Sequence, residues 1–90
     1  MPPHTTIVLP AFNEEEALPV VVDDIRSVLG PDADILVVDD GSSDGTADVA
    51  RKLGCSVEAH SLNRGKGAAI RTGVAAASGE IVIVMDAVAT

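Results

Sequence analysis

Aromatic residues are almost absent from this 90-residue chain, which has one Phe and no Tyr or Trp. Any hydrophobic core must therefore consist of Val, Ile, Leu and Ala. The chain has one cysteine, Cys55, so an intrachain disulfide framework and a cysteine-rich zinc site are both excluded. Cations are also few, because 6 Lys and Arg against 14 Asp and Glu give a net charge of −8. This balance argues against a protein that binds nucleic acid backbones.

Long hydrophobic runs are absent as well, since none approaches the ~20 residues that span a bilayer. The start of the chain, residues 1–4, lacks the basic and apolar parts of a signal peptide. Together with the single thiol, this favours a cytoplasmic location, or a peripheral place at the membrane in longer forms. Hydrophobic residues make up 47% of the chain, which argues against disorder, and the length suits one domain over residues 1–90.

The most informative stretch is residues 35–46, ILVVDDGSSDGT. Its β-branched apolar run predicts a strand buried on both faces, as in a parallel sheet. Asp39 and Asp40 follow at the carboxyl end of that strand, where open α/β sheets bind ligands. Gly41 permits a sharp turn, and Asp44 is a predicted cap for the next helix. Turn chemistry and capping alone are an alternative explanation of these acids.

Hydrophobic periodicity predicts strands alternating with helices. The predicted strands are 6–9, 34–39, 55–60 and 81–85, and the predicted helices are 14–29, 44–53 and 68–77. Pro10 is expected to end the first strand, and Asn13 to cap the first helix. His4 and His60 are interpreted as incidental, and Cys55 as a small buried hydrophobe.

This alternation with short loops implies right-handed crossovers and a mainly parallel four-stranded sheet with helices on both faces. The expected strand order is 3-2-1-4, in an α/β fold with three layers. The order of the strands then reverses between the first and the fourth. Such a switch point is a natural crevice for a nucleotide.

Four motifs occur in order: PAFNE at 10–14, VDDGSSDGT at 38–46, NRGKG at 63–67, and GEI at 79–81 leading to MDA at 85–87. The ordered set resembles the N-terminal, nucleotide-binding half of inverting family 2 glycosyltransferases. Dolichol- and polyprenyl-phosphate mannosyl- and glucosyltransferases are the most similar members. The resemblance implies a Rossmann-like GT-A half-domain that binds a UDP- or GDP-sugar and supports transfer of its hexose to an acceptor such as a polyprenyl phosphate.

The resemblance also implies roles for individual residues. Pro10, Ala11 and Phe12 match the loop that lines the nucleoside pocket, and Glu14 matches a residue near the base or ribose. Asp40 matches an acid that accepts a hydrogen bond from the base edge, as a carboxylate can from an imino N–H. Lys66 matches a cation beside the base and phosphates. Asp86, with Ala87 beside it, matches the first acid of the Asp-x-Asp motif, which binds Mg²⁺ or Mn²⁺.

The sequence departs from the family pattern at Val88, which stands where the motif has its second acid and offers no oxygen ligand. The acceptor-binding half and a catalytic base also have no counterpart in these residues, although inverting transfer needs a base. We therefore expect a truncated GT-A domain over residues 1–90, with weak or no transfer by this chain alone.

Two alternatives stay open. One is a non-catalytic interaction module, a homo-oligomer formed through the apolar edge of the strand at 81–85. The other is a nucleotidyltransferase, although those proteins carry a basic, Gly-rich loop after the first strand, whereas residues 10–14 are acidic and lack glycine. The loop at 63–67 either contacts phosphate or is a surface loop.

Overall fold

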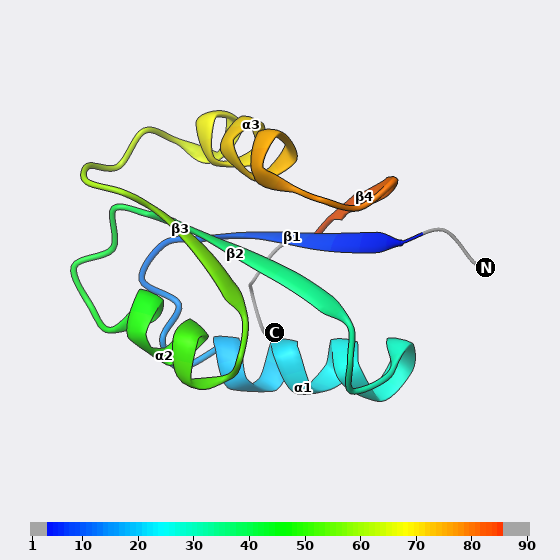
Figure 1. Cartoon of the computed structure of the whole chain (residues 1–90). Helices are drawn as coiled ribbons and strands as arrows, with labels where there is room; N and C mark the ends of the chain where they lie inside the picture. Colours follow the sequence, from blue (N-terminus) through cyan, green and yellow to red (C-terminus); the bar gives the residue numbers. More distant parts are fainter. Residues whose placement is uncertain (1–3, 86–90) are drawn as a thin grey trace.

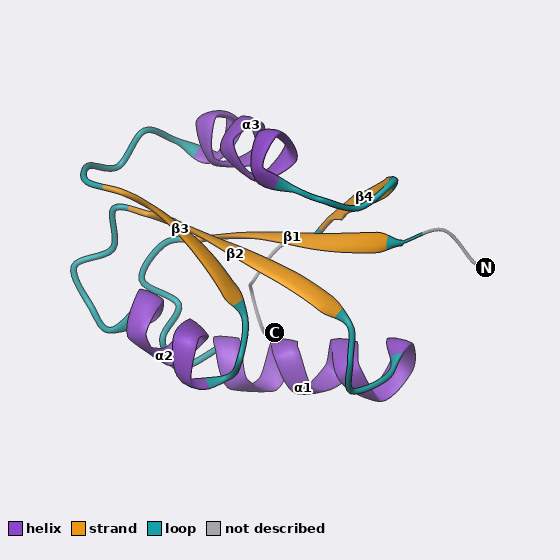
Figure 2. Cartoon of the chain, in the orientation of Figure 1, coloured by secondary structure: helices purple, strands orange, loops and turns teal. Residues whose placement is uncertain are grey.

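The computed structural model describes residues 4–85 and has seven elements that alternate between strand and helix. These are β1 (Thr5–Ala11), α1 (Leu18–Leu29), β2 (Asp34–Asp40), α2 (Thr46–Lys52), β3 (Ser56–His60), α3 (Lys66–Ala76) and β4 (Ile81–Val84). The four strands pair in parallel in the order β3-β2-β1-β4. This confirms the predicted fold class and strand order (Figures 1 and 2).

Helices cover both faces of the sheet, with α3 on one face and α1 and α2 on the other (Figure 1). The alternation of side chains along β1 and β2 divides the core accordingly. Ile7, Leu9 and Val37 pack with residues of α1 and α2, whereas Val8 and Val38 pack with Ala69 of α3. As expected from the composition, aliphatic side chains and alanines form both clusters, and Cys55 is buried among them.

Strand β1 continues through Pro10 to Ala11, so the prediction that Pro10 ends the strand was wrong. The reason lies in which neighbour each residue faces. The carbonyl of Val8 accepts a hydrogen bond from the N–H of Met85, so the backbone N–H and C=O of Val8 are directed toward β4. The backbone groups of Pro10, two residues further along the strand, are directed the same way. Within residues 4–85, the pairing described between β1 and β4 reaches Val8, so the missing N–H of Pro10 interrupts none of these described ladder bonds.

Helix α1 begins at Leu18 rather than at residue 14, and its N-cap is Ala17. Asn13 does not cap it, because Asn13 has a positive φ of 52° and its side chain is engaged elsewhere. Pro19 then falls in the first turn, where proline is tolerated. The other boundaries agree with the predicted ones to within two residues.

Helix α3 lies unusually close to the sheet at Gly73. A Cβ at this position would overlap Val8 Cγ1 and would lie 3.1 Å from Val38 Cγ2. Ala68 and Ala69, one turn earlier, are also small and buried. This close approach brings the neighbouring Thr72 within reach of the end of β3, which matters for the site described below.

Candidate functional site

Three loops meet at the carboxyl edge of the sheet, namely residues 12–17, 41–45 and 61–65. They follow β1, β2 and β3 and lie together at the left of Figure 2. Asp39 and Asp40 are the last residues of β2, which lies between β1 and β3 in the sheet. The sequence predicts this position for both acids.

Asn13 ties the first loop to the second. Its Oδ1 accepts hydrogen bonds from the N–H of Ser43 (2.9 Å) and of Asp44 (3.4 Å). Its own N–H donates to Ser42 Oγ at 2.8 Å, and the N–H of Ser42 donates to Asp39 Oδ1 at 3.0 Å. The residue expected to begin a helix is therefore a brace between two loops.

Asp44 and Glu15 continue this bracing. The Asp44 carboxylate accepts hydrogen bonds from the N–H and hydroxyl of Thr46, and from the N–H of Glu15 at 3.3 Å. In return, Glu15 Oε2 accepts from the N–H of Gly45 at 2.9 Å. Although partial desolvation opposes it, these hydrogen bonds lower the pKa of Asp44. Asp44 thus supports the start of α2 as predicted, although Gly45 holds the N-cap position.

Asp40 joins the second loop to the third. Its side chain is 6% exposed, and Oδ1 accepts hydrogen bonds from the N–H of Arg64 (2.9 Å) and from His60 Nδ1 (2.7 Å). Oδ2 accepts from the N–H of Gly65 at 2.9 Å. Burial alone would raise the pKa of this carboxyl, but the hydrogen bonds from His60 and the two amides lower it below the usual value. Asp40 is therefore an ionised acceptor at neutral pH.

His60 is a buried partner of this acid, so its interpretation as incidental was wrong. Its side chain is 6% exposed, and Nε2 lies 2.8 Å from Thr72 Oγ1 on α3. Because ionised Asp40 only accepts, Nδ1 must carry the proton in the Asp40–His60 hydrogen bond. The sequence holds one signal for this pair, since parallel register places His60 directly beside Asp40.

The other predicted site residues are spread along the same edge. Pro10 and Ala11 are buried at the end of β1, while Phe12 is 46% exposed. Glu14 borders a hollow of about 330 Å³ that its loop forms with Asp44. Lys66 is the first residue of α3. The predictions for Asp86 and Ala87 fall outside the described residues.

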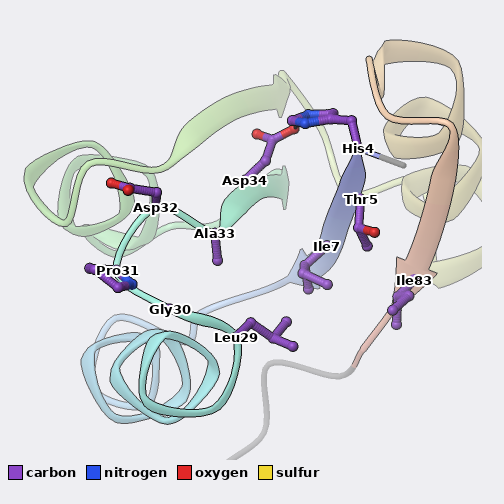
Figure 3. Close-up of a pocket in the computed structure, with 10 residues that line it drawn as sticks. All are labelled: His4, Thr5, Ile7, Leu29, Gly30, Pro31, Asp32, Ala33, Asp34 and Ile83. Carbon is purple, nitrogen blue, oxygen red and sulfur yellow. Dashed lines mark hydrogen bonds and ion pairs between the residues drawn. The ribbon is translucent and has the colours of Figure 1, made fainter. Parts of the chain in front are cut away.

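A larger hollow, of about 650 Å³, lies at the opposite, amino-terminal edge of the sheet (Figure 3). Ile7 and Ile83 reach into it from β1 and β4, and Leu29 from the end of α1. None of the predicted nucleotide-site residues within the described range 4–85 lines it.

Within residues 4–85, no group of three or more His, Cys, Asp and Glu side chains is arranged to hold a metal ion. The predicted ligand Asp86 lies beyond that range. Among the helices of the described part of the chain, none has the length and apolar character that crossing a membrane requires.

The model of glycosyl transferase family 2 matches residues 6–87. The chain belongs to that family. Human dolichyl-phosphate beta-glucosyltransferase is 39% identical over 97 residues, which cover 91% of this chain and 30% of that protein. Undecaprenyl-phosphate 4-deoxy-4-formamido-L-arabinose transferase of Pectobacterium carotovorum is 34% identical over 93 residues, covering 93% and 28%. This family 2 chain thus spans less than a third of the length of these relatives.

Solved structures of GT-A glycosyltransferases share the fold. The mannosyltransferase PcManGT of Pyrobaculum calidifontis, in complex with GDP-Man and Mn²⁺, matches with a TM-score of 0.82 and 28% identity over 97% of this chain and 28% of its own. Glucosyl-3-phosphoglycerate synthase of Mycobacterium tuberculosis, in complex with Mn²⁺, UDP and phosphoglyceric acid, matches with a TM-score of 0.80 and 33% identity, covering 94% and 33%. The predicted GT-A family is therefore confirmed.

Proposed function

We propose that the carboxyl edge of this sheet binds the nucleoside diphosphate of a UDP- or GDP-sugar, whose hexose the whole protein transfers to an acceptor such as a polyprenyl phosphate. The observation that carries the proposal is Asp40, a buried and ionised acceptor at the end of β2. A nucleobase presents N–H donors on its edge, and such a carboxylate is suited to accept one. Family membership and the GDP-Man and UDP held by the two similar solved enzymes support the same class of donor. The names of the relatives support a polyprenyl-type phosphate as the acceptor.

The roles proposed for the remaining residues come from the resemblance to the family. The exposed ring of Phe12 would cover the nucleoside from the end of β1, beside Pro10 and Ala11, and Glu14 would lie near the ribose. Lys66, at the start of α3, would offset phosphate charge. These assignments carry the family pattern onto this chain.

A divalent cation is part of the proposal. Two similar enzymes were solved with Mn²⁺. By the resemblance to the family, Asp86 and Ala87 would stand at the positions of its metal-binding motif. The residues described do not themselves form a metal site, and Val88 adds no ligand. If Asp86 holds Mg²⁺ or Mn²⁺, the ion would offset charge on the diphosphate.

Calorimetric titration with UDP and GDP, each with and without Mn²⁺, tests the function. We expect saturable binding of a nucleoside diphosphate, strengthened by Mn²⁺ and weakened at least tenfold by Asp40→Asn, which replaces an acceptor by a partial donor. Asp24→Asn, an equal change of charge at an exposed position on α1, is the control. Absence of binding under every condition would refute the proposal. Turnover of a donor by these 90 residues alone would refute the expectation of weak or no transfer.

A second candidate is self-association through β4. This strand is at one end of the described sheet, and Ile81, Ile83 and Val84 are each at least 40% exposed. Such an apolar edge can pair with another strand, here β4 of a second copy. Light scattering over a hundredfold range of concentration should then give a mass that rises toward the dimer. A constant monomer mass would exclude this candidate.

A further inference from the structure

The Asp40–His60–Thr72 chain of hydrogen bonds limits what the Asp40 carboxylate can still accept. An ionised carboxylate has about four acceptor positions, two on each oxygen. On Oδ1 both are occupied, by His60 Nδ1 at 2.7 Å and by the N–H of Arg64 at 2.9 Å. On Oδ2 one is occupied, by the N–H of Gly65 at 2.9 Å. Among the hydrogen bonds made within residues 4–85, this leaves one acceptor position of Asp40 unoccupied, on Oδ2.

The two candidate bases differ in what they donate to a carboxylate. Guanine offers two adjacent donors, its imino N1–H and its exocyclic N2–H₂, which together match the two oxygens of one carboxylate. Uracil offers a single imino N–H between two carbonyl groups, which is one donor. A carboxylate with a single unoccupied acceptor position therefore matches uracil. Guanine, on entering the same site, would have one of its two donors left without a partner.

His60 is in a fixed position for this task. Thr72 on α3 holds the far side of the ring at 2.8 Å, and the close packing of α3 at Gly73 places Thr72 there. Both side chains of the Asp40–His60 pair are 6% exposed, so water does not readily replace His60 as the donor to Oδ1.

We propose that His60 is a specificity-determining residue, which occupies Oδ1 of Asp40 and so selects a uridine over a guanosine diphosphate. The inference rests on the proposed function, because it presumes that Asp40 faces the base. His60 acts through Asp40 and need not touch the nucleotide, so it is a positioning residue.

The experiment measures the ratio of the GDP and UDP dissociation constants for the 90-residue chain in one buffer, by calorimetry. For the unmodified chain we expect UDP to bind at least about tenfold more tightly, the scale of one matched base-edge contact. Binding of both nucleotides with a smaller ratio would overturn this inference and leave the proposed function standing. Binding of neither would overturn both.

Two variants of His60 form a matched pair. His60→Asn keeps a donor near the position of Nδ1 and should keep the ratio within about threefold of the original. His60→Gln places its donor near the position of Nε2, toward Thr72, and frees Oδ1. Its ratio should fall to within about threefold of unity, mainly because GDP binds more tightly. Equal ratios in the two variants would overturn the proposal.

Thr72→Val controls for disturbance of the packing. It removes the hydroxyl beside Nε2 but leaves the Asp40–His60 hydrogen bond, so the ratio should stay within about threefold of the original. Circular dichroism confirms folding of each variant. If His60→Gln does not fold, the ratios of the unmodified chain and of His60→Asn still test the proposal. Loss of the preference for UDP over GDP in either of them would overturn it.

Discussion

Replacing Asp40 by Asn should destabilise the fold far more than the same change at its neighbour Asp39. Asp40 accepts three hydrogen bonds in a buried position, from His60, Arg64 and Gly65. Asp39 is buried to a similar degree, but from the described part of the chain its side chain accepts a single, local hydrogen bond, from the N–H of Ser42. Both substitutions remove one negative charge from an acidic chain, so the difference between them isolates the local contacts.

The magnitude follows from the contacts. A hydrogen bond to a charged group contributes about 1.5–3 kcal/mol net, and a buried donor left unpaired costs about 1–3 kcal/mol. In Asp40→Asn the amide carbonyl keeps part of this hydrogen-bond energy, but the new amide N–H₂ faces other N–H groups. We therefore expect a loss of about 2–4 kcal/mol in the free energy of unfolding, against about 1 kcal/mol for Asp39→Asn.

Urea denaturation followed by circular dichroism measures both values, since the chain has no Trp for fluorescence. With a slope near 1–1.5 kcal/mol/M for a small domain, the Asp40→Asn midpoint should fall by about 2 M, and that of Asp39→Asn by less than about 1 M. Midpoints that agree within about 0.3 M would refute the reasoning, because Asp40 would then hold the third loop no better than a local turn contact does.

Four further outcomes are expected. Gly73→Ala should lower the free energy of unfolding by about 1–3 kcal/mol, because the added Cβ would overlap the sheet. Gly67→Ala, also in α3 but with room for a Cβ, should raise it by about 0.5–1 kcal/mol. Thermal melts in which both variants shifted the melting temperature in the same direction would contradict this. Gly41→Ala should also destabilise, by at least 1 kcal/mol in the same melts, since Gly41 has φ +73° and abuts the backbone of the third loop. Burial raises the pKa of the Cys55 thiol despite a nearby arginine. A thiol reagent at pH 8 should therefore modify Cys55 slowly until urea unfolds the chain. Fast labelling of the folded chain would contradict the burial of this thiol. Folding lowers the pKa of Asp40, so its stabilising contribution is full above its ordinary pKa of 3.8 and is lost as the pH falls below it. In urea titrations, the difference in free energy of unfolding between the unmodified chain and Asp40→Asn should therefore narrow from pH 7 to pH 3. A constant difference would contradict the lowered pKa.

The fold could be predicted because its signals are local and repeated. Apolar runs such as 35–38 and 81–84, separated by helical periodicity, leave few arrangements other than a parallel sheet in the order 3-2-1-4. The motifs likewise placed Asp40 at the correct edge of the sheet. Neither inference required knowledge of contacts between distant residues.

Two of the details that escaped prediction depend on contacts between residues far apart in the sequence. Asn13 resembles a helix cap in sequence, but hydrogen bonds to the second loop hold it outside the helix. His60 resembles a surface residue at the end of an edge strand, but α3 covers it. In both cases a partner about 10–30 residues away decides the outcome, which single-sequence periodicity does not report.

The contact between Asp40 and the loop after β3 is made with main-chain amides rather than side chains. The identity of the side chain at Arg64, which is solvent-exposed, is therefore immaterial to it. Proline is the exception, since it has no N–H to offer. Evolution or an engineer could vary this residue widely to tune what surrounds a ligand, while the path of the loop stays the same.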